Sequence, residues 1–142
     1  DHGGFELKNI ILDHLKKQGI EILDCGTYSM ESCDYSDYAE KVCGLVNKKE
    51  ADFGILICGT GIGMSMAANK TRGIRCALCG DVFSAKATRA HNDANVLALG
   101  GRVVGPGLAL EIVDAYLGTQ FSGDERHKRR IGKVMSLEEN RD

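Results

Sequence analysis

The sequence predicts an α/β fold in which a central parallel sheet lies between two layers of helices. Two observations lead to this prediction. Short apolar runs alternate along the chain with amphipathic segments of helical length, which is the pattern of βαβ units. One run, residues 53–58, is apolar at nearly every position, as in a strand buried on both faces. The 142 residues suit one domain and contain no internal repeat or long linker.

The first part of the chain is predicted to contain two helices and two strands. Residues 5–17 carry an apolar stripe at helical spacing. Residues 20–23 form a short apolar run and are predicted to be a strand. A polar loop through Tyr35 then leads to a second helix, whose apolar face lies between residues 38 and 46. The buried strand at residues 53–58 follows.

The remainder of the chain continues the alternation. Its predicted elements are, in order, a helix that reaches residue 70, a strand at 74–79, a helix at 82–89, a strand at 95–99, a helix at 106–117 and a charged helix at about 124–138. Pro106 suits the first turn of its helix, because a missing N–H costs nothing at that position.

Composition and charge narrow the classes of function. The 18 Lys and Arg against 20 Asp and Glu leave a net charge of −2, so we expect no nucleic-acid partner. No apolar run approaches the length of about 20 residues that a membrane span needs, and we expect no membrane partner. The six cysteines are scattered, and we interpret them as free thiols of a cytoplasmic protein.

A glycine-rich loop follows the buried strand, at the place where open α/β sheets bind ligands. Gly59, Gly61 and Gly63 leave backbone N–H groups uncovered at the start of a helix, whose dipole favours an anion. A tight turn that requires glycine would have the same spacing. A dinucleotide fingerprint fits less well, because Met64 stands at its last glycine position, although Asp81 follows the next strand as an acidic residue would.

Cys58 and His91 are the candidates for proton transfer. Cys58 ends the buried strand; such a cysteine is usually a core residue, but a helix N-terminus beside it would favour a reactive thiolate. His91 and Asn92 lie in a polar break between a helix and a strand. A histidine there could act as an acid or base, or simply belong to a surface turn.

A basic run near the C-terminus is the candidate phosphate site. Helical spacing stacks Arg126 on Arg130, with His127 beside them, an arrangement suited to a phosphate dianion. The alternative is a solvated helix face.

Seven segments, spread along nearly the whole chain, carry a resemblance to a known family. They are DHGGFELK at 1–8, CDYSDYA at 33–39, GILICGTGIGM at 54–64, AANK at 67–70, DVFSA at 81–85, HNDAN at 91–95 and GRV at 101–103. In order and spacing they resemble the type B ribose-5-phosphate isomerase family, within the wider group that includes the galactose-6-phosphate isomerase subunits.

The resemblance implies a Rossmann-like three-layer subunit, with residues 1–142 as a single sugar-phosphate isomerase domain. It implies a homodimer or homotetramer with active sites shared between subunits, and a helix at about 124–138 that contributes to phosphate binding and subunit contacts. It also implies interconversion of D-ribose 5-phosphate and D-ribulose 5-phosphate through an enediolate, without metal or cofactor, in the pentose phosphate pathway. The family's first strand has no counterpart before Asp1, so we expect an apolar run upstream of it.

The resemblance also implies roles for individual residues. Cys58 would be the base that moves a proton between C2 and C1, since family members without it use a glutamate at the position of Met64. Thr60 and the amides of Gly59, Gly61 and Gly63 would stabilise the oxyanion. His91 would open the furanose ring, and Asp1 would hold sugar hydroxyls. The implied phosphate ligands are His2, Arg102, Arg126 and Arg130, with Tyr35, Asn92 and His127 as further candidates.

Two other interpretations stay open at this point. The substrate could be a six-carbon sugar phosphate, either allose 6-phosphate or galactose 6-phosphate. Residues 91–93 and the Arg126–His127 pair argue against the galactose-6-phosphate subunits, where those positions generally differ. A nucleotide-binding module without catalysis would explain the glycine loop, but it would not explain Cys58 and His91 together.

Overall fold

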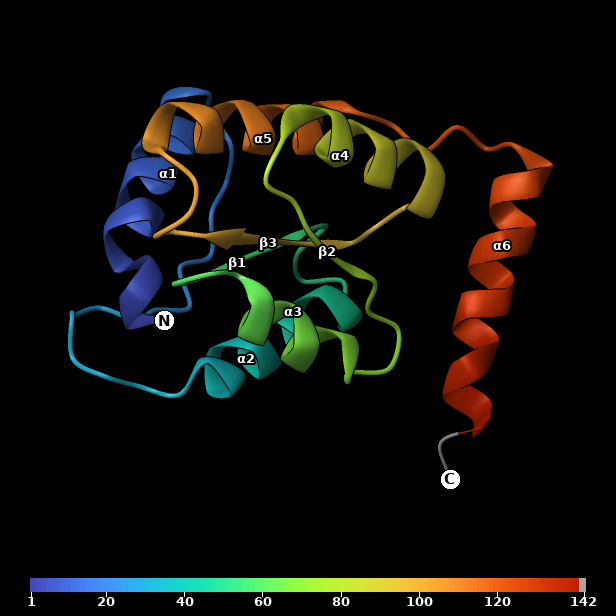
Figure 1. Ribbon diagram of the computed structural model, residues 1–142, viewed down its shortest axis with the longest axis horizontal. Helices are drawn as coiled ribbons and strands as arrows, with labels where there is room; N and C mark the ends of the chain where they lie inside the picture. The colour runs from blue at the N-terminus through green and yellow to red at the C-terminus, as the bar shows by residue number, and fades with distance from the viewer. Residues whose placement is uncertain (141–142) are drawn as a thin grey trace.

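Three parallel strands form one open sheet between two layers of helices in the computed structural model, which describes residues 1–140 (Figure 1). The strands are β1 (Gly54–Cys58), β2 (Cys76–Leu78) and β3 (Val96–Gly100), in the order β1-β3-β2. The helices are α1 (Phe5–Lys17), α2 (Tyr35–Asn47), α3 (Ile62–Asn69), α4 (Val82–Ala87), α5 (Pro106–Gly118) and α6 (Glu125–Ser136). The predicted α/β class with a central parallel sheet is confirmed.

Each face of the sheet has its own apolar core. Successive side chains of a strand point to opposite faces. In the central strand β3, Leu97 and Leu99 pack with α1, α4 and α5, whereas Val96 and Ala98 pack with α2 and α3. All four side chains are fully buried. This two-sided burial is the reason that the strands have no polar positions in their sequence.

The loops that follow β1 and β3 lie side by side. The two strands pair in parallel from Gly54 opposite Val96 to Cys58 opposite Gly100, so their carboxyl ends reach the same edge of the sheet. Beyond that edge, the N–H of Gly101 donates to the Cys58 carbonyl at 2.8 Å. The sheet therefore brings the glycine loop after β1 next to Arg102.

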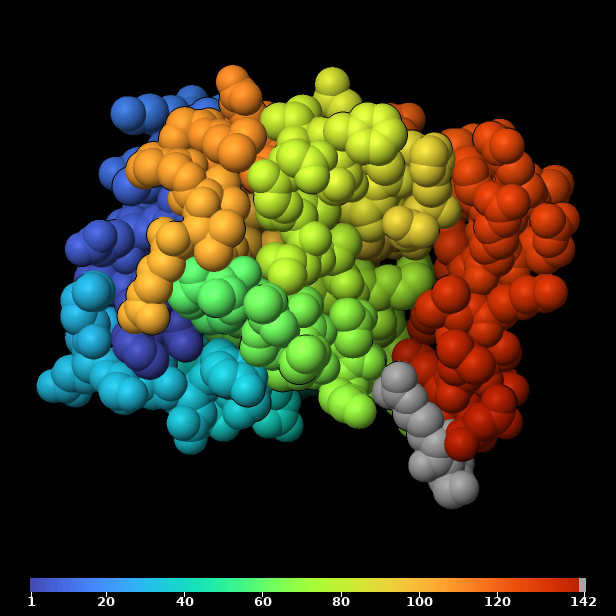
Figure 2. Space-filling view, in the orientation of Figure 1, coloured from blue at the N-terminus to red at the C-terminus, as the bar shows by residue number. Residues whose placement is uncertain are grey.

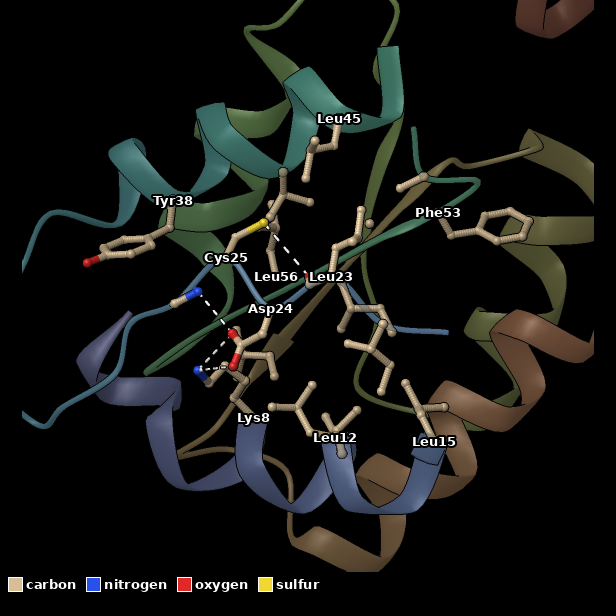
Figure 3. Close-up of a pocket in the computed structure, with 18 of the residues that line it drawn as sticks. Lys8, Leu12, Leu15, Leu23, Asp24, Cys25, Tyr38, Leu45, Phe53 and Leu56 are labelled. Atoms are coloured by element: carbon tan, nitrogen blue, oxygen red, sulfur yellow. Dashed lines mark hydrogen bonds and ion pairs between the residues drawn. The ribbon is translucent and has the colours of Figure 1, made fainter. Parts of the chain in front are cut away.

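The strand predicted at residues 20–23 does not form. The segment runs past the outer edge of β1. Residues of the segment and of β1 both line a groove of about 330 Å³ (Figure 3). Leu12, Leu23 and Leu56 are among the side chains in this groove. Backbones must come within about 4.8 Å to share strand hydrogen bonds, and β1 pairs only with β3 among the described residues. The apolar residues of the segment therefore cover a groove instead of joining a ladder.

The helix predicted at 82–89 changes its geometry before it ends. The α-helical part stops at Ala87, and a π-helical turn covers Thr88–Asn92. His91 and Asn92 therefore lie in a helical turn, and the expectation of a polar break there was wrong. The turn ends at Asp93, whose carboxylate accepts from Arg89 Nη1 at 2.9 Å.

The remaining elements differ from the predicted ranges mainly at their ends. The strand expected at 74–79 is shorter, because only Cys76–Leu78 pair with β3. The C-terminal helix α6 ends at Ser136 and continues as a 3₁₀ turn, Leu137–Asn140. This helix stands apart from the sheet layers and forms one side of the molecule (Figures 1 and 2). No helix within residues 1–140 has both the length and the apolar character to cross a bilayer.

Candidate active site

Cys58 lies at the carboxyl end of β1, immediately before the loop that leads to α3. The Gly61 N–H donates to Cys58 Sγ at 3.1 Å. A backbone donor aimed at the sulfur, at the positive end of a helix dipole, stabilises negative charge on that atom. Cys58 is only 5% exposed, so a charge there would be sheltered from bulk water.

The buried Cys43 and Cys79 and the partly buried Cys76 have surroundings that disfavour a charged sulfur. Burial raises the pKa of Cys43 and of Cys79 to about 11, and that of Cys76 to about 12. These thiols are therefore protonated at neutral pH and packed as small core residues. All six cysteines are free, as predicted. Cys58 is distinguished from the other three by its backbone donor.

The glycine loop can take its shape only because Gly61 lacks a side chain. Its φ is +78°, a left-handed conformation that strains other residues. A Cβ there would lie 2.5 Å from Leu78 Cδ1 and 2.8 Å from the Leu99 carbonyl carbon. Beside it, the exposed Thr60 accepts the Ile62 N–H at its Oγ1 (3.2 Å). The loop therefore presents a hydroxyl and backbone amides at the mouth of the site.

The N-terminal turn packs directly on this loop. A Cβ at Gly3 would lie 2.8 Å from the Gly59 nitrogen, so the two backbones touch. Asp1 Oδ1 accepts the Gly3 N–H at 2.9 Å, which fixes its carboxylate at the start of the turn. His2 Nδ1 accepts the Cys33 N–H at 3.2 Å, so the neutral ring carries its proton on Nε2. Two polar side chains thus border the loop.

Arg102 and Tyr35 approach the loop from two further directions. A Cβ at Gly59 would lie 3.2 Å from Arg102 Nη1, and one at Gly63 would lie 2.8 Å from Tyr35 Cζ. Both side chains are exposed, and no carboxylate in the described part of the chain pairs with Arg102. The guanidinium is therefore available to an anion at the mouth of the loop.

A second cluster of predicted residues lies around α6. His91, Asn92, His127 and Arg130 line a cavity of about 620 Å³. The rings of His91 and His127 stack with centroids 4.5 Å apart and planes at 34°. His127 is 5% exposed, whereas His91 is exposed. Arg126, on the same helix, has Nη2 at 3.7 Å from Asp124 Oδ2.

The charge of His127 follows from its surroundings. Burial lowers the pKa of His127, and the neighbouring His91 and Arg126 lower it further, while Asp124 opposes them. The ring is therefore neutral at neutral pH. A neutral His127 leaves the nearby guanidinium groups as the positive charges of this cluster.

Within one chain the two clusters lie at opposite ends of the sheet (Figure 1). Cys58 ends β1, whereas His91 and Asn92 precede the amino end of the parallel strand β3. Five paired residues separate these ends by about 13 Å, at roughly 3.3 Å per residue. The Cys58 end gathers Asp1, His2, Tyr35, Cys58, Gly59, Thr60, Gly61, Gly63 and Arg102. The α6 end gathers His91, Asn92, Arg126, His127 and Arg130.

Ser122 is a member of the second cluster that the sequence did not indicate. Its Oγ lies 2.7 Å from His127 Nδ1. A serine in a polar connection carries no periodicity or motif, so only the contact identifies it. In residues 1–140 no three His, Cys, Asp or Glu side chains are grouped so that they could hold a metal ion.

Comparison with known proteins gives a consistent result. Residues 1–134 match the family described as Ribose/Galactose Isomerase. Ribose-5-phosphate isomerase B of Escherichia coli is 51% identical over 141 residues, which are 99% of this chain and 94% of that protein. The structure of Clostridium thermocellum ribose-5-phosphate isomerase B superposes with a TM-score of 0.97 at 52% identity, covering 100% of this chain and 95% of that one. The structure of Mycoplasma genitalium ribose-5-phosphate isomerase B with bound ribulose-5-phosphate superposes with a TM-score of 0.93 at 42% identity. The match covers 98% of this chain and 92% of that one.

Proposed function

The chain belongs to the ribose/galactose isomerase family, and on that premise we propose that its active site interconverts D-ribose 5-phosphate and D-ribulose 5-phosphate. The observation that carries this proposal is the Gly61 N–H aimed at Cys58 Sγ, at the end of β1 and beside the Asp1–His2 turn. A similar structure contains bound ribulose-5-phosphate, which is the ketose of this reaction. The protein is an isomerase.

Cys58 is the base of the proposed reaction. Its thiolate removes the proton from C2 of the open-chain aldose; the C2–H electron pair forms the C1–C2 double bond, and the carbonyl electrons move onto O1. Thr60 and the loop amides donate to this oxygen while it carries charge. The enediolate then gains a proton at O1 and loses one from O2. The Cys58 thiol returns its proton to C1, which leaves a ketone at C2.

The rest of the substrate is held by the residues around the loop and α6. Asp1 accepts hydrogen bonds from sugar hydroxyls, and His91 transfers a proton at the ring oxygen when the furanose opens. The phosphate is bound by the positive and donating side chains His2, Arg102, Arg126 and Arg130, with Tyr35, Asn92 and His127 beside them. Binding energy at the phosphate keeps the open chain over Cys58.

The proposal includes a homo-oligomer with shared active sites, as a dimer or tetramer. A proton moves only between groups in hydrogen-bond reach, and about 13 Å of sheet separates His91 from the Cys58 end of its own chain. A partner subunit that supplies His91 and the α6 residues removes this gap. An exposed apolar face supports the contact; its residues are Ile62, Met66, Leu78, Phe83, Val103 and Leu108.

These apolar side chains come from segments that meet on one face. Figure 2 shows residues near 62–66, 78–83 and 103–108 adjoining one another beside the Cys58 end of the sheet. Apolar surface of this kind favours association with another protein surface. In the cell, this assignment places the enzyme in the pentose phosphate pathway and in the cytoplasm.

Substrate choice is tested by measuring turnover of ribose 5-phosphate beside that of allose 6-phosphate and galactose 6-phosphate. We expect kcat/KM to be highest for ribose 5-phosphate. Preferred turnover of a six-carbon sugar phosphate would contradict the proposed substrate. Binding of NAD or ATP in calorimetry, without binding of any sugar phosphate, would contradict the isomerase itself.

The role of the thiol is tested with Cys58→Ala. Loss of the general base should lower kcat by at least about a hundredfold, while ribose 5-phosphate binding changes by less than about threefold. The matched control is Cys25→Ala, whose thiol lines the groove along β1 and donates to the Leu23 carbonyl. Turnover by Cys58→Ala close to that of the control would remove Cys58 as the base.

A further inference from the structure

Ser122 is the one member of the His91 cluster to which the proposed reaction gives no task. We infer that Ser122 is a positioning residue: its hydroxyl fixes the buried His127 ring, and that ring holds His91 in the orientation from which it opens the sugar. The inference rests on the proposed function, because it concerns the ring-opening step. It adds a residue that contacts neither the sugar nor the phosphate.

Two hydrogen bonds, one at its backbone and one at its side chain, hold Ser122 in place. The residue lies in the connection between α5 and α6, and its N–H donates to the Ala90 carbonyl at 3.0 Å. This bond ties the connection to the residue before His91. The Asp124 N–H donates to Ser122 Oγ at 3.1 Å. The hydroxyl therefore occupies a defined position relative to the turn that carries His91.

The Ser122 hydroxyl orients the His127 ring. Its Oγ accepts the Asp124 N–H and also lies 2.7 Å from His127 Nδ1, which is hydrogen-bond distance. A hydroxyl can donate to a ring nitrogen or accept from it, so the contact forms with either neutral tautomer. This hydrogen bond fixes the rotation of the His127 ring.

The His127 ring passes this constraint to His91. The two rings are stacked at a centroid distance of 4.5 Å, with His127 buried and His91 exposed. The buried ring is therefore the surface on which the exposed ring rests. If His127 rotated about its χ2 angle, His91 would lose that support and sample other rotamers. Proton transfer depends steeply on such orientation.

The charges of the cluster fit a supporting ring better than a reacting one. The neutral state of His127 means that His91 can take up a proton without a second imidazolium against its face. Arg126, Arg130 and Asp124 are the other charged groups around His127. None of them bonds to His127 Nδ1, because Asp124 Oδ2 is 3.9 Å from that atom.

The test compares two reactions that differ only in the need for ring opening. Ribose 5-phosphate is a cyclic sugar in solution, so its turnover requires His91. Ribulose 5-phosphate cannot form a furanose ring, because its 5-oxygen carries the phosphate. Washout of deuterium from its C1 uses Cys58 and the oxyanion donors but no ring opening. The variants are Ser122→Ala, Ser122→Thr and the control Ser136→Ala, whose hydroxyl donates to the Lys133 carbonyl at 2.7 Å.

We expect Ser122→Ala to lower kcat for ribose 5-phosphate about tenfold and to leave the washout rate within about twofold of wild type. Ser122→Thr, which keeps the hydroxyl, should restore turnover, and Ser136→Ala should change neither rate. Unchanged ribose 5-phosphate turnover in Ser122→Ala would overturn the inference. So would a washout rate that falls in parallel with turnover, since that pattern indicates a general loss of structure.

NMR of the imidazole signals provides a readout that does not depend on activity. The His91 ring signals should shift in Ser122→Ala and stay in place in Ser136→Ala. If the His91 signals did not move in Ser122→Ala, that result would contradict the role of Ser122 but not the proposed function. A wild-type enzyme without ribose 5-phosphate turnover would instead contradict the proposed function, so the two failures are distinguishable.

Discussion

Gly61 illustrates how a single residue serves both the fold and the chemistry. Its left-handed backbone lets the loop leave β1 and enter α3, and the same geometry aims its N–H at Cys58 Sγ, 3.1 Å away. Leu78 and Leu99 close the space where a side chain would be. The sequence indicated glycine here for either an anion site or a tight turn. The structure shows the tight turn, and the anion site stays a prediction.

At this scale the prediction concerns Gly61→Ala. The new Cβ strains the left-handed backbone and overlaps Leu78 and Leu99, so the free energy of unfolding should fall by about 1–3 kcal/mol. The control Gly132→Ala adds a methyl group to α6 with nothing within 4 Å, and should raise stability by about 0.5–1 kcal/mol. Urea unfolding and kcat are measured for both. A Gly61→Ala chain as stable and as active as wild type would contradict this account.

Among the elements, α4 shows how a short helix is held at the carboxyl edge of the sheet. Its N-cap, Asp81, accepts the Ser84 N–H at 2.6 Å and the Ser84 hydroxyl at 2.8 Å. These hydrogen bonds, the backbone one first, hold the pKa of the Asp81 carboxyl below its usual range. The N–H groups of a helix's first turn have no acceptor within the helix, and the cap supplies one. A charged oxygen also suits the positive end of the helix dipole.

The cap makes a prediction about acid stability. The pKa of Asp81 is lower in the folded state than its ordinary value of 3.8. The charged carboxylate therefore adds to the free energy of unfolding above pH 3.8, and this contribution disappears as the pH falls through the folded pKa. Asp81→Asn keeps a capping oxygen but cannot titrate. The melting temperature of wild type should exceed that of Asp81→Asn at about pH 5, and the difference should shrink towards about pH 3. Asp13→Asn, at an exposed position that caps no helix, is the control. A difference that stays constant over this range would refute the prediction.

At the scale of the whole molecule, the fold separates the Cys58 cluster from the cluster around α6. Cys58 and the glycine loop lie at one end of the parallel strands, and His91 with α6 lies at the other. α6 and the 3₁₀ turn after it also stand away from the sheet layers, with Val134 of α6 54% exposed and Leu137 of the turn 60% exposed (Figure 1). Both features are expected of a subunit that completes its site with a neighbouring copy.

Complementation between two inactive variants tests that arrangement. Cys58→Ala and His91→Asn chains should each be inactive alone. In randomly mixed dimers with shared sites, half of the dimers are mixed and each has one intact site, so about a quarter of wild-type activity should return. Co-expression followed by a ribose 5-phosphate assay measures this. If each chain used its own His91, mixing would restore no activity.

The sequence by itself determined what contiguous residues encode. Alternating apolar runs and amphipathic stretches predicted the sheet between helices, because each element must bury its own apolar face. The short stretch from Cys58 to Gly63 predicted a sulfur beside uncovered amides, because strand, loop and helix follow one another without interruption. These features need no knowledge of distant contacts.

Tertiary structure alone decided the features that depend on distances between remote segments. Residues 20–23 have the pattern of a strand, but the groove beside β1 gives them no partner at hydrogen-bonding distance. The opposite locations of Cys58 and His91 follow from which end of a strand each one adjoins. The contact of His91 with His127 follows from how α6 packs against the turn Thr88–Asn92. Periodicity reports which face a residue occupies, whereas only packing fixes which faces meet.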